Sequence, residues 1–266
     1  MGAGIATSFL IAGNPVVIVE ADVVRGEAAT AAVEQSLRRL ARRDRDLDVE
    51  AALARLSIVY ELGETRDCSV VVEAVPENLE TKQTIFGKLD RLLDADVVLG
   101  SNTSSLPIAG IAEGLLHPER VIGAHFFNPV PVSALVEIVV GSETSDSVVE
   151  SMTALVESLQ KTPIVVSDSP GFASSRLGLV LGLEAIRMLE AEVASASDID
   201  TAMELGYRHP MGPLRLTDLV GLDVRLAIAK HLEAELGERF RPPALLQDMV
   251  EAGHLGKKTG QGFYKW

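Results

Sequence analysis

A histidine and a glutamate in two neighbouring apolar segments have the residue types that proton transfer requires. His125 lies in the apolar segment 120–127, and Glu137 lies in a second one, 135–140. The connection 128–131 is short, so we expect the two segments to lie side by side as strands. A carboxylate beside an imidazole fixes the tautomer and orientation of the ring, which a general base for an alcohol proton needs. A lone histidine is more often a hydrogen-bonded core residue, but a glutamate inside an apolar strand needs a partner.

Small polar residues follow another apolar run. The segment 101–105 reads Ser-Asn-Thr-Ser-Ser and comes directly after the run 97–99. Polar residues at the carboxyl end of a parallel strand lie where α/β sheets bind ligands, although the same residues would also serve as a loop and helix cap. The other four histidines have no comparable companions, and no metal cluster or acyl-transfer triad is present. We therefore predict no metal site.

Glycines open the chain ahead of an apolar run at 16–19. Gly2 and Gly4 are typical of a helix start that approaches a phosphate or a neighbouring strand closely. Glu20 ends the run, at about the spacing from Gly2 at which a dinucleotide fold places the acid for the adenosine ribose. An ordinary glycine-rich turn with a solvent-exposed glutamate explains these residues equally well.

Short apolar runs alternate with amphipathic stretches through the first two thirds of the chain. Continuous apolar runs are typical of parallel strands buried on both faces, and here they occupy 16–19, 70–72, 97–99 and 164–166. With helical patterns between them, they predict a Rossmann-type doubly wound sheet in residues 1–168. Residues 169–266 show only helical patterns, so we expect an all-α second domain. Its first helix, 176–192, is apolar on most sides, which is typical of a core or a subunit interface.

The composition excludes several classes of protein. With 47% hydrophobic and 23% charged residues, the 266-residue chain is globular rather than disordered. A net charge of −14 repels phosphate backbones, so we expect no nucleic-acid partner. No apolar run approaches the ~20 residues of a membrane span. The single Cys68 cannot form an internal disulfide, which fits a reducing cytoplasm.

Together these segments resemble the 3-hydroxyacyl-CoA dehydrogenase family, in particular its short-chain members that act on 3-hydroxybutyryl-CoA. The resemblance covers almost the whole chain, through the blocks MGAGIA, VVEAVPENLETK, SNTSSLPI, HFFNPVPVSALVEIV, SPGFASSR, DIDTAMELGYRHPMGPLRLTDLVGLD and GKKTGQGFYKW. Several such blocks in one order form a far more specific signal than a partial glycine motif.

The resemblance implies NAD-dependent oxidation of (S)-3-hydroxyacyl-CoA to 3-oxoacyl-CoA in fatty-acid metabolism, including β-oxidation. It also implies a homodimer formed through the C-terminal helices. His125 would take the hydroxyl proton while hydride passes to the nicotinamide, and Glu137 would orient His125. The residues implied at the substrate are Ser104, Asn128 and Ser175. Those implied at the cofactor are Gly2, Glu20, Glu77, Lys82 and Asn102.

Two departures from the family pattern matter. The family usually has asparagine where this chain has Ser175, so a substrate contact is expected to be lost or bridged by water. The family also has a β-strand and two glycines ahead of the residues that match Met1 and Gly2. We expect the strands at Val16 and Val70 to face a gap there, either because the start was placed at an internal Met1, which we favour, or because another segment fills it.

Two other functions are compatible with these residues. One is a dehydrogenase for a hydroxy acid without CoA, such as a sugar acid, on the same scaffold. The other is a catalytically silent homologue that binds NAD. The retention of His125, Glu137 and Ser104 argues against the silent homologue.

Overall fold

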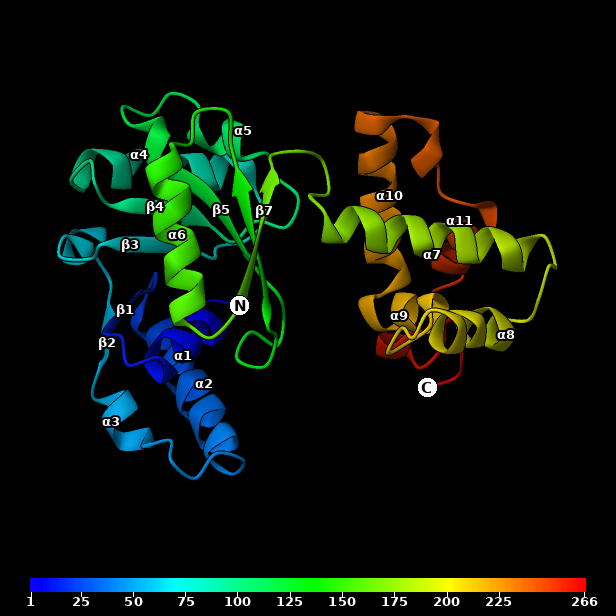
Figure 1. Cartoon of the computed structure of the whole chain (residues 1–266), viewed down its shortest axis with the longest axis horizontal. Coiled ribbons are helices and arrows are strands. Elements are labelled where there is room, and N and C mark those ends of the chain that lie inside the picture. The colour runs from blue at the N-terminus through cyan, green and yellow to red at the C-terminus, as the bar shows by residue number, and fades with distance from the viewer. The chain divides into compact units, whose positions relative to one another are not determined.

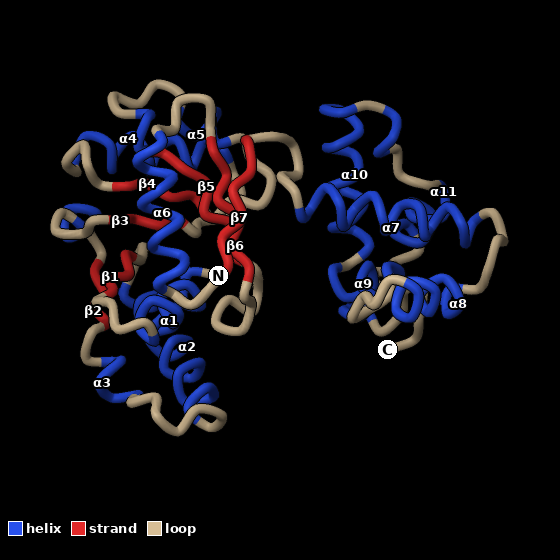
Figure 2. The backbone as a smooth tube through the Cα atoms, viewed as in Figure 1, coloured by secondary structure: helices blue, strands red, loops and turns tan.

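The chain divides into an α/β unit and a helical unit. A computed structural model describes all residues, 1–266, and separates them into unit 1, Met1–Ser169, and unit 2, Pro170–Trp266 (Figure 1). All strands lie in unit 1, whereas unit 2 contains helices and two isolated bridges in its C-terminal tail (Figure 2). The predicted fold class, a Rossmann-type α/β domain followed by an all-α domain, is confirmed.

The larger sheet of unit 1 has five strands. Their order is β3 (Val70–Glu73), β4 (Val98–Ser101), β5 (Val121–Phe126), β6 (Leu135–Val140) and β7 (Thr162–Ser167). Strands β3 to β5 run parallel, and β6 is antiparallel to β5 and parallel to β7. Every residue of β4 and β5 is buried, which explains why these segments are apolar or small except at His125.

A separate pair of strands lies beside the first helices. Strand β1 (Val16–Val19) pairs in parallel with β2 (Leu56–Val59). Neither β1 nor β3 pairs with any other strand on its second edge, as we expected for the strands at Val16 and Val70. Strand β2 was not predicted, because Ser57 interrupts its apolar run.

Helices cover the strands of unit 1. Those packed near β1 and β2 are α1 (Gly2–Ile11), α2 (Val23–Ala41) and α3 (Val49–Leu53). Those near the larger sheet are α4 (Leu79–Leu92), α5 (Ile108–Ala112) and α6 (Asp146–Ser158). Asp22 and Asn78 cap α2 and α4 by accepting hydrogen bonds from the amides of Arg25 and Thr81. The core of the larger sheet includes Ile122, Phe126 and Ile138 together with Met152 and Val156 of α6.

Unit 2 has its own helical core. Its helices are α7 (Ser174–Glu190), α8 (Ala196–Thr201), α9 (Pro213–Val220), α10 (Leu222–Leu236) and α11 (Ala244–Glu251). Buried Asp218 accepts hydrogen bonds from the amides of Phe263 and Tyr264 at 2.9 Å each, so the C-terminal tail is fastened to α9. No helix is long and apolar enough to span a membrane.

Candidate active site

His125 and Glu137 form a buried pair in the larger sheet. They lie directly opposite each other in the antiparallel register of β5 and β6. The Nδ1 atom of His125 is 2.7 Å from Oε2 of Glu137, and the two residues are 8% and 0% exposed. Opposed residues of antiparallel strands hold their side chains on the same face, so the strand register itself brings the imidazole and the carboxylate together. The structure thus brings together the two residues that sequence analysis selected.

The residues next to His125 are held by the neighbouring strand. Phe126 donates its backbone N–H to Oδ1 of Asn102 at 2.9 Å, and Asn102 donates its own N–H to the carbonyl of Glu73. The ring of Phe127 lies 4.4 Å from the His125 ring, centroid to centroid. Asn128 follows in an exposed loop. Asn102 therefore ties the ends of β3, β4 and β5 together and fixes the backbone that carries His125.

Ser104 lies in the exposed loop after β4, and Glu77 organises that loop. One oxygen of Glu77, Oε1, accepts the hydroxyl of Thr103 at 2.6 Å and the amide of Ser104 at 2.9 Å. The amide and hydroxyl of Ser105 both lie 3.2 Å from the same oxygen. Three of the five small polar residues at this strand end, Thr103, Ser104 and Ser105, are thus ordered around one carboxylate.

Burial and hydrogen bonding act in opposite directions on the pKa of Glu77. Its partial burial favours the neutral acid, but the hydrogen bonds from Thr103 and Ser104 and the charge of Lys82 outweigh burial and hold the pKa of Glu77 below its usual range. Glu77 is therefore a carboxylate at neutral pH, which suits a residue that orders several N–H and O–H donors.

Lys82 completes this polar cluster from α4. Its Nζ lies 2.8 and 2.9 Å from the two carboxylate oxygens of Glu73 and 3.3 Å from Oε2 of Glu77. Lys82 is 1% exposed and Glu73 is 5% exposed. The hydroxyl of Ser101 also donates to Glu73, at 2.7 Å. Sequence analysis gave Glu77 and Lys82 a contact with the cofactor, which stays a prediction, and it missed Glu73.

Residues at three strand and helix ends could hold a dinucleotide. Glu20 follows the carboxyl end of β1 and is half-buried, and Asn102 follows β4. Gly2 is the first residue of α1, whose N-terminus has no side-chain cap. A Cβ built on Gly2 would lie 3.7 Å from Cβ of Ala74, just beyond β3. The uncapped N–H groups of such a helix suit a phosphate, and a carboxylate at a strand end suits ribose hydroxyls, so these residues fit NAD.

Ser175 belongs to unit 2, where it lies in the first turn of α7 and is half-buried. Its expected contact with substrate stays a prediction.

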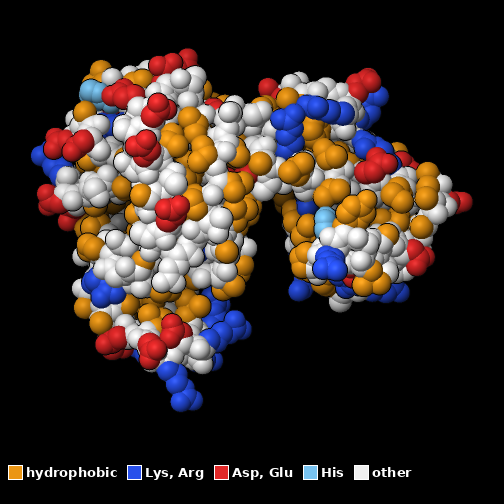
Figure 3. All heavy atoms as spheres, in the orientation of Figure 1, with side chains coloured by type: hydrophobic (Ala, Val, Ile, Leu, Met, Phe, Trp, Pro, Cys, Tyr) orange, Lys and Arg blue, Asp and Glu red, His pale blue; other side chains and the backbone are white.

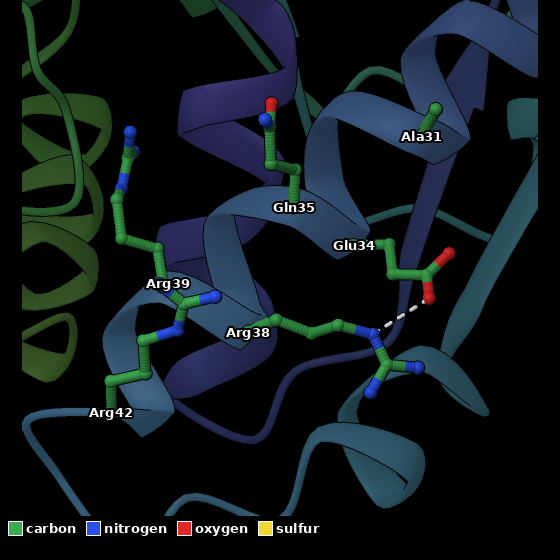
Figure 4. A pocket seen from close by; sticks show the side chains of 6 residues that line it. All are labelled: Ala31, Glu34, Gln35, Arg38, Arg39 and Arg42. Carbon is green, nitrogen blue, oxygen red and sulfur yellow. Dashed lines mark hydrogen bonds and ion pairs between the residues drawn. The ribbon is translucent and has the colours of Figure 1, made fainter.

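A surface pocket lies elsewhere in unit 1, on α2. It has a volume of about 420 Å³ and is lined by Ala31, Glu34, Gln35, Arg38, Arg39 and Arg42. Figure 4 shows the ion pair within it, in which Nε of Arg38 lies 2.8 Å from Glu34. None of the predicted site residues lines this pocket, so it is not the candidate site. No group of acidic, histidine and cysteine side chains in the chain could hold a metal ion.

Comparison with known proteins gives consistent matches to one family. The family model described as "3-hydroxyacyl-CoA dehydrogenase, NAD binding domain" matches residues 1–169, and the one for the C-terminal domain matches residues 171–266. A 3-hydroxybutyryl-CoA dehydrogenase of Mycobacterium tuberculosis is 43% identical, over 100% of this chain and 95% of that protein. A probable 3-hydroxybutyryl-CoA dehydrogenase of Bacillus subtilis is 42% identical, over 100% of this chain and 94% of that protein.

Solved structures agree with the sequence matches. The (S)-3-hydroxybutyryl-CoA dehydrogenase of Ralstonia eutropha superposes with a TM-score of 0.95 and 39% identity, covering 100% of this chain and 95% of that one. A more distant structure, at 27% identity and a TM-score of 0.78 over 100% of this chain and 87% of that one, is an NAD-dependent dehydrogenase of a pyridine carboxylic acid.

Proposed function

This chain belongs to the 3-hydroxyacyl-CoA dehydrogenase family, and from that membership we propose that it oxidises (S)-3-hydroxyacyl-CoA to 3-oxoacyl-CoA with NAD and catalyses the reverse reaction. The observation that carries the proposal is the 2.7 Å contact between Nδ1 of His125 and the carboxylate of Glu137. Such a reaction belongs to fatty-acid metabolism and includes the oxidative step of β-oxidation.

His125 acts as the general base in this proposal. With Nδ1–H donating to Glu137, the basic nitrogen of the ring is Nε2, which takes the proton of the 3-hydroxyl. The ring then carries a positive charge, and the adjacent Glu137 carboxylate stabilises it. NAD, when bound, supplies the acceptor for the hydride that leaves C3. In the reverse direction the protonated ring returns its proton to the carbonyl oxygen.

The other predicted residues have binding roles. Ser104, Asn128 and Ser175 contact the substrate, and Gly2, Glu20, Glu77, Lys82 and Asn102 serve the cofactor. Glu77 accepts a hydrogen bond from the Ser104 amide and Lys82 lies against Glu77, which supports a role of both residues in shaping the site as well. A Glu20 carboxylate would accept from a ribose 2′-hydroxyl and repel a 2′-phosphate, so the enzyme should prefer NAD to NADP. Equal kcat/KM values for NAD and NADP would refute this role of Glu20.

We infer that the protein works as a homodimer in the cytoplasm. Large apolar side chains are exposed on unit 2, and Figure 3 shows hydrophobic side chains gathered over α7. On α7 and α9 they are Leu177, Val180, Leu181, Leu216, Leu219 and Val220. Exposed apolar side chains on two helices that contact each other favour a protein partner, and the family resemblance supports a second copy. Light scattering of the wild type and of Leu177→Asp tests the dimer. The lone Cys68 supports the proposed location in a reducing compartment, the cytoplasm.

The proposed activity is tested by NADH formation. The purified protein is assayed with (S)-3-hydroxybutyryl-CoA, with longer (S)-3-hydroxyacyl-CoA esters and with free 3-hydroxy acids. Oxidation of the CoA esters alone supports the proposal. Oxidation of the free acids alone establishes the alternative function, a dehydrogenase for a hydroxy acid without CoA. The structural relative that acts on a pyridine carboxylic acid makes this alternative chemically reasonable. No reaction with either set establishes a silent homologue.

A further inference from the structure

Unit 1 holds a buried lysine that pairs with no acid. Lys161 lies between α6 and β7 and is 8% exposed. Its Nζ donates to the backbone carbonyl of Val130 at 2.6 Å and to that of Ser133 at 2.7 Å. Burial lowers the pKa of Lys161, and no carboxylate opposes that effect. Burying an ammonium group without a counter-charge costs stability, so a neutral side chain would suit this space better if packing were its only role. What the lysine adds is the pair of hydrogen bonds.

Both carbonyls belong to the β5–β6 loop, residues 127–134. Two amides of this loop donate to the carbonyl of Pro129, both at 3.0 Å, so the loop is closed into a tight turn. Thr162, the residue after Lys161, donates its amide to the carbonyl of Ala134 at 2.6 Å. Lys161 and Thr162 therefore hold the middle and the end of the loop, and Lys161 does so through its side chain.

The β5–β6 loop carries the residues that directly follow the catalytic strand. The ring of Phe127 lies 4.4 Å from the ring of His125, centroid to centroid. Asn128, which we place at the substrate, is the next residue, and the strand after the loop carries Glu137. A shift of the loop would therefore move the groups beside the imidazole while β5 and β6 stay paired in register.

The same loop lies against the first helix. Val130 is 2% exposed and belongs to the core of the larger sheet. A Cβ built on Gly4 of α1 would lie 3.2 Å from both Cβ and Cγ2 of Val130, and 3.8 Å from Cδ of Pro131. The missing side chain of Gly4 thus lets the loop approach α1, whose uncapped N-terminus suits a phosphate of NAD. The loop lies next to both the helix that fits the cofactor and the base.

We propose that Lys161 is a positioning residue, whose ammonium group holds the carbonyls of Val130 and Ser133 and so fixes the β5–β6 loop between α1 and His125. This inference rests on the proposed function, which makes His125 the base and places Asn128 at the substrate. Lys161 acts through the loop and exchanges no proton in the reaction. A displacement of reacting groups by ~1 Å can cost about 10²-fold in rate, so a loop held by two hydrogen bonds is a sensitive point for catalysis.

The first test removes the ammonium group and keeps the length of the side chain. Lys161→Met should lower kcat for (S)-3-hydroxybutyryl-CoA roughly 10–100-fold, while KM for NAD changes about threefold or less, because alignment is lost and not the cofactor site. Lys161→Arg should recover part of the lost kcat, since a guanidinium can donate to both carbonyls. Steady-state NADH formation below the melting temperature of each variant measures these values.

A matched control separates positioning from a general loss of stability. Leu89 of α4 is 1% exposed and lies outside the core cluster that contains Val130. Leu89→Ala should lower the melting temperature at least as much as Lys161→Met, because it leaves a cavity, yet keep kcat of the folded protein within about twofold of the wild type.

A second readout does not depend on turnover. The amides of Val132 and Ser133, which donate to Pro129, should exchange with deuterium faster in Lys161→Met than in the wild type, whereas those of β5 and β6 keep their protection. Leu89→Ala should show no such local change.

A second variant displaces the loop from its other side. Gly4→Ala keeps Lys161 but places a methyl group against Val130, so it should also lower kcat. Because both changes act on one loop, the double variant Lys161→Met/Gly4→Ala should be slower than Lys161→Met by only about threefold or less. If Lys161→Met does not fold, the kcat and the loop exchange of Gly4→Ala and Lys161→Arg decide the matter.

Three results would overturn the inference. One is a Lys161→Met protein that keeps kcat within about twofold of the wild type while its melting temperature falls, which would make Lys161 purely structural. The second is an equal loss of kcat in Leu89→Ala, and the third is unchanged exchange of the loop amides. If the wild type oxidises no CoA ester, the proposed function fails and the catalytic role of Lys161 fails with it. An active wild type beside any of the three results refutes the positioning role alone.

Discussion

Two of the buried pairs of a carboxylate and a basic side chain in unit 1 are His125 with Glu137 and Lys82 with Glu73. The contact distances are nearly equal, 2.7 and 2.8 Å. Lys82 is 1% exposed and is held by two carboxylates, whereas His125 is 8% exposed at the end of a strand that leads into a loop. Histidine is also the side chain that ordinarily exchanges a proton near neutral pH, and lysine is not.

The comparison separates two uses of a buried ion pair. Lys82 of α4 holds Glu73 of β3 and also lies against Glu77 through permanent charge, so its removal should affect stability. His125 changes its charge during a reaction, so its removal should affect rate. Substitutions at the two pairs should therefore change different measured quantities, the free energy of unfolding at Lys82 and kcat at His125.

The largest effect is expected at His125. His125→Gln should lower kcat by roughly 10²–10⁴-fold, the usual range for a positioned general base, because no other group takes the hydroxyl proton. Its melting temperature should stay close to that of the wild type. Steady-state NADH formation and thermal unfolding check both parts. Retention of more than half of the activity would rule out His125 as the base.

At Lys82 a large effect is expected on stability instead of rate. Lys82→Met should reduce the free energy of unfolding by about 3–5 kcal/mol, because it leaves the buried Glu73 carboxylate without a cation. Denaturant unfolding measures this loss. The double variant Lys82→Met/Glu73→Gln should recover part of it, and Lys88→Met, at an exposed position of α4, should cost little. A stable Lys82→Met protein with reduced kcat alone would mean that the two pairs do not differ as described.

A smaller effect on rate is expected at Glu137. Glu137→Gln keeps the shape of the side chain but removes the charge that stabilises the protonated ring. We expect kcat to fall about 10–100-fold, in line with ~1.5–3 kcal/mol for a hydrogen bond to a charged group, while KM for NAD stays unchanged. A change in KM for NAD with unaltered kcat would instead give Glu137 a binding role.

The smallest effect is expected at Ser175, where this chain departs from its family. Ser175→Asn should raise kcat/KM for (S)-3-hydroxybutyryl-CoA by up to about tenfold, because one ordinary hydrogen bond is worth ~1 kcal/mol. Parallel steady-state assays of the wild type and the variant resolve such a change in kcat/KM. A loss of activity would show that the pocket around serine has adapted to a different substrate.

The sequence sufficed for those parts of the fold that local patterns specify. His125 and Glu137 could be paired because two apolar strands joined by a four-residue connection have few ways to pack. The caps Asp22 and Asn78 also precede recognisable helices. The cap of α8 could not be located from the sequence alone, because serines stand at both 195 and 197, and Ser195 is the one that accepts the amide of Asp198.

Long-range packing could not be predicted from the sequence. Strand β2 is a four-residue strand that only its parallel pairing with β1 identifies. Glu73 and Ser101 end two apolar strands, and nothing local indicates that the Glu73 carboxylate accepts hydrogen bonds from both Ser101 and Lys82 of α4. The burial of Arg225 likewise depends on α7, whose Gly178 lies against it from 47 positions away in the numbering (225 − 178). These features depend on which elements meet, and residue type alone does not determine that.

A double-mutant cycle on His125 and Glu137 tests the central claim most directly, namely that the two residues act as one catalytic unit. The kcat values of the wild type, His125→Gln, Glu137→Gln and the double variant are measured with saturating NAD and (S)-3-hydroxybutyryl-CoA. If Glu137 acts only through the charge on His125, the double variant should be as slow as His125→Gln, within about threefold. If instead the two losses multiply, Glu137 acts independently of His125, and the account of the pair is wrong.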